Sequence, residues 1–135
     1  MADPRPRILL ADDDPDIRAI LRAFLSERDV ELFEAHNGEA ALETLLVEQP
    51  DLVVLDVMMP GLNGWEICRY VKQKEALKDT RVLMLTAVGK TVNELTSPLY
   101  GADAYLDKPF ELEQLDEKVR ELLADVGRTL EPAAL

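Results

Sequence analysis

The sequence predicts one α/β domain built on a doubly wound parallel sheet, and three observations support this prediction. Short apolar runs alternate with longer stretches of helical spacing along the whole chain of 135 residues. The segment 51–56 is apolar at all four central positions, as expected for a strand covered on both faces. The length is sufficient for the core of one domain. Because parallel strands need crossover helices, we expect a five-stranded sheet with helices on both faces.

The first half of the chain shows clear helix starts. Asp14 is a candidate N-cap, Pro15 suits the first helical position, and Asp16 is an acid in the first turn. Pro50 separates the second helix from the third strand. The strands expected in this half are 8–11, 30–35 and 51–56, and the helices are 15–25 and 38–48.

The second half repeats the alternation with one irregular helix. Asn63 and Glu66 form a capping-box pair that opens a helix fading near residue 78. A similar pair at Thr91 and Glu94 opens the next helix, which Pro98 should shorten or kink. The remaining strands are expected at 81–86 and 104–107, and the last helix at 112–123. We therefore expect a short extension at 1–6, a domain at 7–125 and a flexible tail or linker stump at 126–135.

Composition excludes several classes of function. The 27 acidic residues outnumber the 15 basic ones, and a net charge of -12 argues against direct nucleic-acid binding over a wide surface. One Cys and one His cannot form a disulfide framework or a Cys/His zinc site. The chain lacks a signal-peptide pattern and a run of about 20 apolar residues that could span a membrane. We expect a cytoplasmic protein.

Polar residues follow the predicted strands where a doubly wound sheet binds ligands, beyond the carboxyl ends of its strands. They are Asp12 and Asp13, Asp56, Thr86 and Lys108. If the first and third strands are neighbours, the carboxylates converge, and each pair repels by roughly 4 kcal/mol at about 4 Å and an effective dielectric near 20. Carboxylates without nearby His or Cys suit Mg²⁺, which usually also binds phosphate oxygens. The pattern therefore indicates phosphoryl chemistry.

These residues resemble the receiver domain of two-component response regulators over about residues 7–124. The matching segments are 8–14, 51–61, 85–87, 101–103 and 108–110. The separations of Asp13 from Asp56 (43 residues), Asp56 from Thr86 (30) and Thr86 from Lys108 (22) also resemble those of the family. The resemblance implies a flavodoxin-like fold with the strand order 2-1-3-4-5.

The resemblance also implies roles for the residues at the strand ends. Asp56 would accept a phosphoryl group from a sensor histidine kinase or a phosphotransfer protein. Asp13 would be the main Mg²⁺ ligand, Asp12 would assist largely through water, and the backbone carbonyl of Met58 would be a third protein contact. Lys108 would neutralise the phosphate, pair with Asp56 before phosphorylation, and precede a cis peptide bond.

Two further residues would form the switch. Thr86 would bond the phosphate and draw its loop inward, which lets the Tyr105 ring rotate from an exposed to a buried position. The output surface would then be the face of the fourth helix, fifth strand and fifth helix, where a downstream protein or effector domain binds. The acidic last helix leaves phosphorylation-dependent pairing of two copies open. Such a protein is not a conventional enzyme, since it acts only on itself.

Two positions depart from the family pattern. Met58 and Val88 flank the route of the attacking water and cannot activate it, so we expect slow autodephosphorylation. A pseudo-receiver that docks partners without phosphate is the main alternative, which the complete set of strand-end residues disfavours. A flavin carrier would need Gly, Ser and Thr instead of three Asp in the first loop. An aspartyl phosphatase would need a second acid near Asp56 and a substrate cap.

Overall fold

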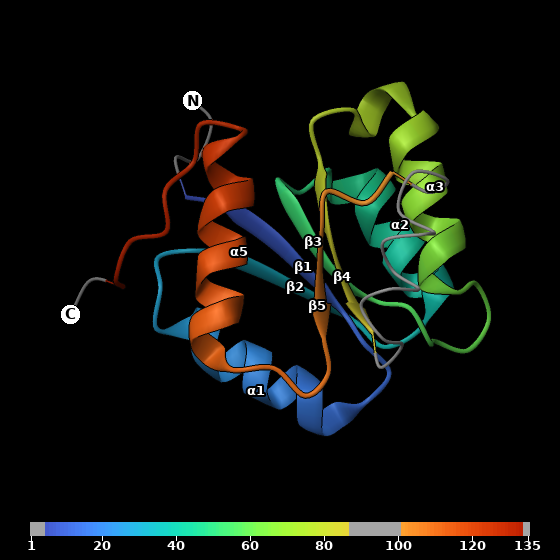
Figure 1. Ribbon diagram of the computed structural model, residues 1–135. Coiled ribbons are helices and arrows are strands. Elements are labelled where there is room, and N and C mark those ends of the chain that lie inside the picture. Colours follow the sequence, from blue (N-terminus) through green and yellow to red (C-terminus); the bar gives the residue numbers. More distant parts are fainter. Residues whose placement is uncertain (1–4, 87–100, 134–135) are drawn as a thin grey trace.

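The fold is organised around a five-stranded parallel sheet in the order β2-β1-β3-β4-β5 (Figure 1). The computed structural model describes residues 5–86 and 101–133. The strands are β1 (Arg7–Ala11), β2 (Glu31–Ala35), β3 (Leu52–Asp56), β4 (Arg81–Thr86) and β5 (Ala104–Asp107). The order confirms the predicted doubly wound topology, in which the chain reverses its winding direction between β1 and β3.

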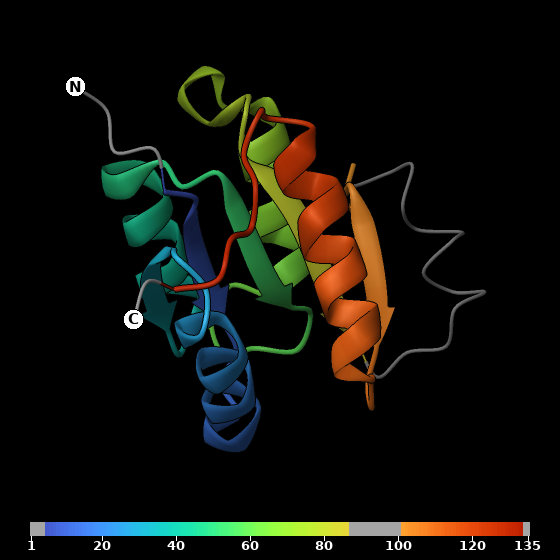
Figure 2. The ribbon, with the colours of Figure 1, turned by 90° about the vertical axis from the view of Figure 1, so that its left-hand side faces the viewer.

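Helices cover both faces of the sheet, as Figures 1 and 2 show. The helices are α1 (Pro15–Ser26), α2 (Gly38–Glu48), α3 (Gly64–Gln73) and α5 (Leu112–Ala124), with a 3-10 turn η1 (Glu75–Leu77) after α3 that was not predicted. α1 and α5 pack on one face, and α2 and α3 pack on the other. The helix expected from Thr91 and the effect of Pro98 lie outside the described residues. Within the described ranges, no helix is long and apolar enough to cross a bilayer.

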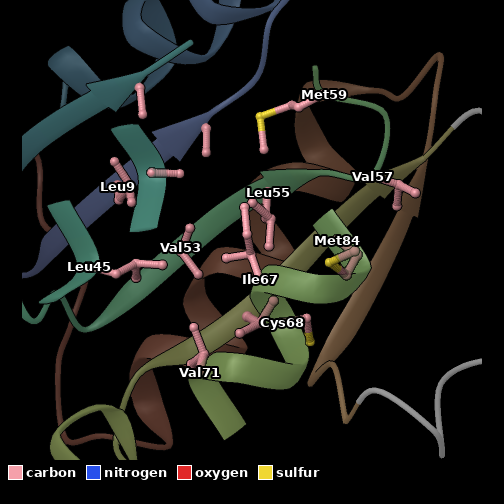
Figure 3. Packing of buried hydrophobic residues seen from close by; sticks show 14 of the residues in the cluster. Leu9, Leu45, Val53, Leu55, Val57, Met59, Ile67, Cys68, Val71 and Met84 are labelled. Carbon is pink, nitrogen blue, oxygen red and sulfur yellow. The ribbon is translucent and has the colours of Figure 1, made fainter. Parts of the chain in front are cut away.

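The core consists of two apolar clusters, one on each face of the sheet. On one face, Ile67, Cys68 and Val71 of α3 point toward β3 and β4, where Val53 and Met84 are fully buried (Figure 3). The other cluster joins α1 and α5 to the opposite face of the strands. Each fully buried aliphatic side chain contributes about 1.5–3 kcal/mol, so a shift in strand register would be strongly unfavourable. Packing on both faces therefore fixes where each strand ends.

Two predicted N-caps are confirmed. The Asp14 carboxylate accepts a hydrogen bond from the Asp16 amide at 2.9 Å, with Pro15 in the first turn of α1. The Asn63 side chain accepts from the Glu66 amide at 3.0 Å and donates to the Glu66 carboxylate at 2.9 Å. These bonds satisfy amides that the helix itself leaves without partners.

Strand register brings the carboxyl ends of β1, β3, β4 and β5 to one edge of the sheet. Ala11 pairs with Leu55, Asp56 with Leu85, and Thr86 with Asp107. The polar residues that end or directly follow these strands therefore lie beside one another.

The segment after α5 packs against the domain instead of leaving it. It runs back toward the turn between α1 and β2 (Figure 2), where the Asp29 amide donates to the Glu131 carbonyl at 2.8 Å. Leu130 is 3% exposed and belongs to the α1–α5 cluster, and Arg120 donates to its carbonyl at 2.9 Å. This differs from the expected flexible tail at 126–135, because apolar burial and backbone hydrogen bonds hold its described part in place.

Candidate functional site

Three carboxylates meet at the carboxyl edge of the sheet, as the sequence predicted. Asp12 and Asp13 follow β1, and Asp56 ends β3; each offers one oxygen, and these oxygens lie within 4.8 Å of one another. Asp12 is fully buried and Asp56 is 4% exposed, whereas Asp13 is exposed. A set of carboxylate oxygens that is open to solvent on one side fits a hard divalent cation such as Mg²⁺.

Lys108 brings a positive charge to this cluster from the end of β5. Its Nζ lies 2.9 Å from Asp12 Oδ2 and 3.4 Å from Asp56 Oδ1. The lysine thus contacts Asp56 as expected but lies closer to Asp12. The Lys108–Pro109 peptide bond is cis, and the Lys108 amide donates to the Thr86 carbonyl at 2.7 Å.

The electrostatics of the site raise the affinity of Asp56 for a proton when no cation is bound. Burial and the adjacent Asp12 charge raise the pKa of Asp56 to about 7, although Lys108 and the Met58 amide act in the opposite direction. Burial alone would lower the pKa of Lys108, but the hydrogen bond and charge of Asp12, together with Asp56, leave it raised. The site is therefore short of positive charge, which a divalent cation would supply.

The loop after β3 (57–63) is held against the site. The Met58 amide donates to Asp56 Oδ1 at 3.2 Å, while the Met58 residue as a whole is 68% exposed to solvent. At the far end of the loop, the Gly64 amide donates to the Val57 carbonyl at 2.9 Å. A Cβ on Gly64 would lie 2.4 Å from the Asp56 carbonyl oxygen, so a glycine is required there. Val88, the other predicted rate-tuning position, lies outside the described residues.

The two predicted switch residues lie on adjacent strands. Thr86 is fully buried at the end of β4, and Tyr105 is partly buried on β5 beside Met84. Side chains alternate along a strand, so Thr86 lies on the same face as Met84. Tyr105 packs in the same cluster as Met84, which places both switch residues on the face that α3 covers.

Two neighbours of the site were not assigned to it from sequence. Arg18 on α1 donates from Nη1 to the Asp12 carbonyl at 2.7 Å, and Trp65 on α3 lies with its ring centroid 6.0 Å from that of Tyr105. The sequence places Arg18 on the first turns of α1, but only the packing of α1 against the end of β1 directs it to Asp12. The sequence shows Trp65 only as an aromatic residue in the first turn of its helix, and the ring contact with Tyr105 depends on how α3 packs against β5.

The arrangement has the parts needed for phosphoryl transfer to a carboxylate. Asp56 offers a nucleophilic oxygen, and Lys108 offers a positive charge for the oxygens of an incoming phosphoryl group. The described residues near Asp56 include no His or Cys nucleophile, since His36 is an exposed residue after β2 and Cys68 is buried on the inner face of α3.

Comparison with known proteins identifies the family. Residues 8–120 match the model of the response regulator receiver domain. A probable transcriptional regulator, ycf27, of Cyanophora paradoxa is 40% identical over 88% of this chain and 48% of its own length. The transcriptional regulatory protein ResD of Bacillus subtilis is 37% identical over 91% of this chain and 50% of its own length. The chain thus spans about half the length of these curated relatives.

The solved structures agree with this match. The signal receiver domain of a signal transduction histidine kinase from Syntrophus aciditrophicus superposes with a TM-score of 0.83 at 32% identity, covering 96% of this chain and 98% of that one. Its fold therefore matches this chain almost from end to end.

Proposed function

The chain belongs to the response regulator receiver domain family of two-component systems, and we propose that it accepts a phosphoryl group on Asp56 from a phosphohistidine of a sensor kinase or phosphotransfer protein. An Asp56 oxygen bonds to phosphorus as the nitrogen–phosphorus bond of the donor breaks, and the released imidazole takes up a proton. The observation that carries the proposal is the buried Asp56 carboxylate beside Lys108 and two further Asp side chains. The chain acts on itself and is not a conventional enzyme.

Asp12, Asp13, Asp56 and the backbone carbonyl of Met58 would hold Mg²⁺ in this proposal. When bound, Mg²⁺ offsets the negative charge that the phosphoryl oxygens bring to the site. The chain itself supplies the remaining functions. Asp56 is the nucleophile, Lys108 pairs with a phosphoryl oxygen, and the buried Asp12 holds Lys108 in place through their contact of 2.9 Å.

The signal would leave the site through β5. In the phosphorylated state, Thr86 bonds a phosphoryl oxygen and Tyr105 moves inward, which alters the face of β5, α5 and the fourth helix expected from the sequence. A groove of about 700 Å³ lies between β5 and α5 and includes Tyr105, Glu117, Lys118 and Glu121. A downstream protein or effector domain would bind this acidic face.

The relatives named as transcriptional regulators are about twice the length of this chain. With a net charge of -12, the chain itself is a poor ligand for nucleic acid, so we assign it the phosphoryl-receiving role and a protein output. The alternative is a pseudo-receiver that docks partners without phosphate. It is less well supported because it leaves the Asp56–Lys108 pair without a role.

The test is the intact mass after incubation with acetyl phosphate, with and without Mg²⁺. We expect one added phosphoryl group in wild type, dependent on Mg²⁺ and absent from Asp56→Asn. The exposed Asp79→Asn variant changes the net charge equally and should behave as wild type. Incorporation that persists in Asp56→Asn would contradict the assignment of the acceptor. Mg²⁺ binding without any incorporation would favour the pseudo-receiver.

A further inference from the structure

We propose that Trp65 is a positioning residue of the switch, which ties the ring of Tyr105 to the loop that follows Asp56. The two rings lie 6.0 Å apart between centroids, at an interplanar angle of 50°. Both are partly buried against the cluster on the α3 face. The inference rests on the function proposed above and concerns its regulation.

Trp65 is fixed to the acceptor strand through its neighbour Gly64. The Gly64 amide donates to the Val57 carbonyl, and its Cα lies so close to Asp56 that a Cβ would be 2.4 Å from the Asp56 carbonyl oxygen. Asn63 caps the same turn through the Glu66 amide. The first turn of α3 therefore cannot shift without moving the backbone beside Asp56.

Tyr105 is fixed to the other side of the site. Its strand pairs with β4, with Met84 opposite Tyr105 and Thr86 opposite Asp107, and the Lys108 amide then donates to the Thr86 carbonyl. Tyr105 consequently lies next to both Trp65 and the strand that carries Thr86. Trp65 forms a second connection from Asp56 to β5, besides the one through Thr86.

This geometry has a consequence for signalling. A phosphoryl group on Asp56 that displaces either the loop 57–63 or Thr86 alters the space between the Trp65 and Tyr105 rings. Removing the Trp65 ring takes away the ring contact that joins Tyr105 to the first turn of α3, so the position of the Tyr105 ring depends less on Asp56. The conservative variant Trp65→Phe keeps an aromatic ring at that place and should retain the coupling.

Fluorescence tests the contact directly, because Trp65 is the only tryptophan of the chain. The emission of Trp65 is compared before and after acetyl phosphate and Mg²⁺, with phosphoryl occupancy measured by intact mass. We expect a change in wild type and in the control Tyr70→Leu, which alters another tyrosine packed on the same cluster. At matched occupancy, Tyr105→Leu should lose most of the change. Full occupancy without a change in wild type, or the same change in Tyr105→Leu, overturns the inference while leaving phosphorylation intact.

A second measurement separates positioning from mere stability. With 3-fluorotyrosine incorporated, the ¹⁹F resonance of Tyr105 is assigned from its loss in Tyr105→Phe. Its shift on phosphorylation should persist in Trp65→Phe and fall by at least half in Trp65→Leu, at matched occupancy. An undiminished shift in Trp65→Leu overturns the proposal even if that variant unfolds more easily. If wild type takes up no phosphoryl group at all, both this inference and the proposed function fail.

Discussion

At the scale of single residues, the site is governed by the excess of negative over positive charge around Asp56. Lys108 is the cation that contacts both Asp12 and Asp56 among the residues the structure describes, and it lies closer to Asp12. The pKa of Asp56 is raised to about 7 by burial and by the Asp12 charge. Near neutral pH, a substantial fraction of Asp56 therefore carries a proton unless a cation is bound.

The raised pKa predicts a specific pH dependence of stability. The folded state binds more protons than the unfolded chain, whose Asp pKa is about 4, so the contribution of Asp56 is complete below pH 4 and is lost as the pH rises through about 7. When the pH is raised from 4 to 8, we expect wild type to lose about 1–3 kcal/mol more unfolding free energy than Asp56→Asn loses. Urea denaturation with EDTA measures it.

The control for this experiment is Asp79→Asn, an exposed residue on the same chain, which should retain the wild-type decline. Mg²⁺ should stabilise wild type most strongly at pH 8, where the carboxylate form dominates. Equal pH slopes in wild type and Asp56→Asn would contradict the assigned pKa.

Slow autodephosphorylation is expected from Met58 and Val88, the two residues that the family resemblance assigns to the route of the attacking water. Met58 is 68% exposed beside Asp56 and has no group to orient or activate water; Val88 offers none either. The double variant Met58→Asn/Val88→Glu should accelerate the decay of the acyl phosphate about 10- to 100-fold. The upper value is the smallest contribution typical of a positioned proton-transfer group. Decay is followed by mass or radiolabel. Rapid decay in wild type that the double variant fails to increase would argue against this.

At the scale of elements, the start of α3 is held close to the site. Two features hold it: the Asn63 cap and the approach of Gly64 to the Asp56 backbone. The cap stabilises the helix, whereas the approach of Gly64 determines how near the helix comes to the acceptor. Substitutions at these adjacent residues should therefore have different effects.

Asn63→Ala should destabilise the protein by about 1 kcal/mol, as expected for a lost cap, with little change in phosphorylation. Gly64→Ala should lower stability by about 2 kcal/mol or more, because the backbone must move apart to admit the Cβ, and it should also slow phosphoryl uptake. Denaturation and the rate of mass increase measure the two effects. Wild-type uptake in Gly64→Ala would show that the close approach is not needed for the chemistry.

At the scale of the whole molecule, the segment beyond α5 belongs to the packed domain. Leu130 fills the α1–α5 cluster, and the backbone of this segment bonds to the turn before β2. The contacts lie at the opposite end of the sheet from Asp56, since they join the region where β2 begins. The segment should thus affect stability without affecting the site.

Leu130→Ala should lower the free energy of unfolding by about 2–3 kcal/mol, the lower range for deleting a buried Leu side chain. Val47→Ala is the matched control, since Val47 is 71% exposed and its loss should have little effect. Phosphoryl uptake from acetyl phosphate should be unchanged in both variants. A stability loss below about 0.5 kcal/mol in Leu130→Ala would indicate that the segment is not held in solution as the structure describes.

The sequence by itself determined the fold class, the strand order through a family resemblance, and the convergence of Asp12, Asp13 and Asp56. These depend on information that is local in the chain: apolar periodicity identifies strands and helices, residues such as Asp14 and Asn63 mark helix starts, and parallel crossovers bring strand ends to one edge. The alternation also located Thr86 and Lys108 at strand ends, although their roles rest on the proposed function.

Only the tertiary structure decided which side chains meet across the sheet. It placed Lys108 nearer Asp12 than Asp56, brought Trp65 to Tyr105, and buried Leu130 where the sequence pattern had ended. These contacts join residues that are far apart in sequence, and they depend on strand register, helix packing and side-chain direction. Periodicity along the chain shows which face a residue occupies, but the partner on that face is set by the three-dimensional packing of other elements.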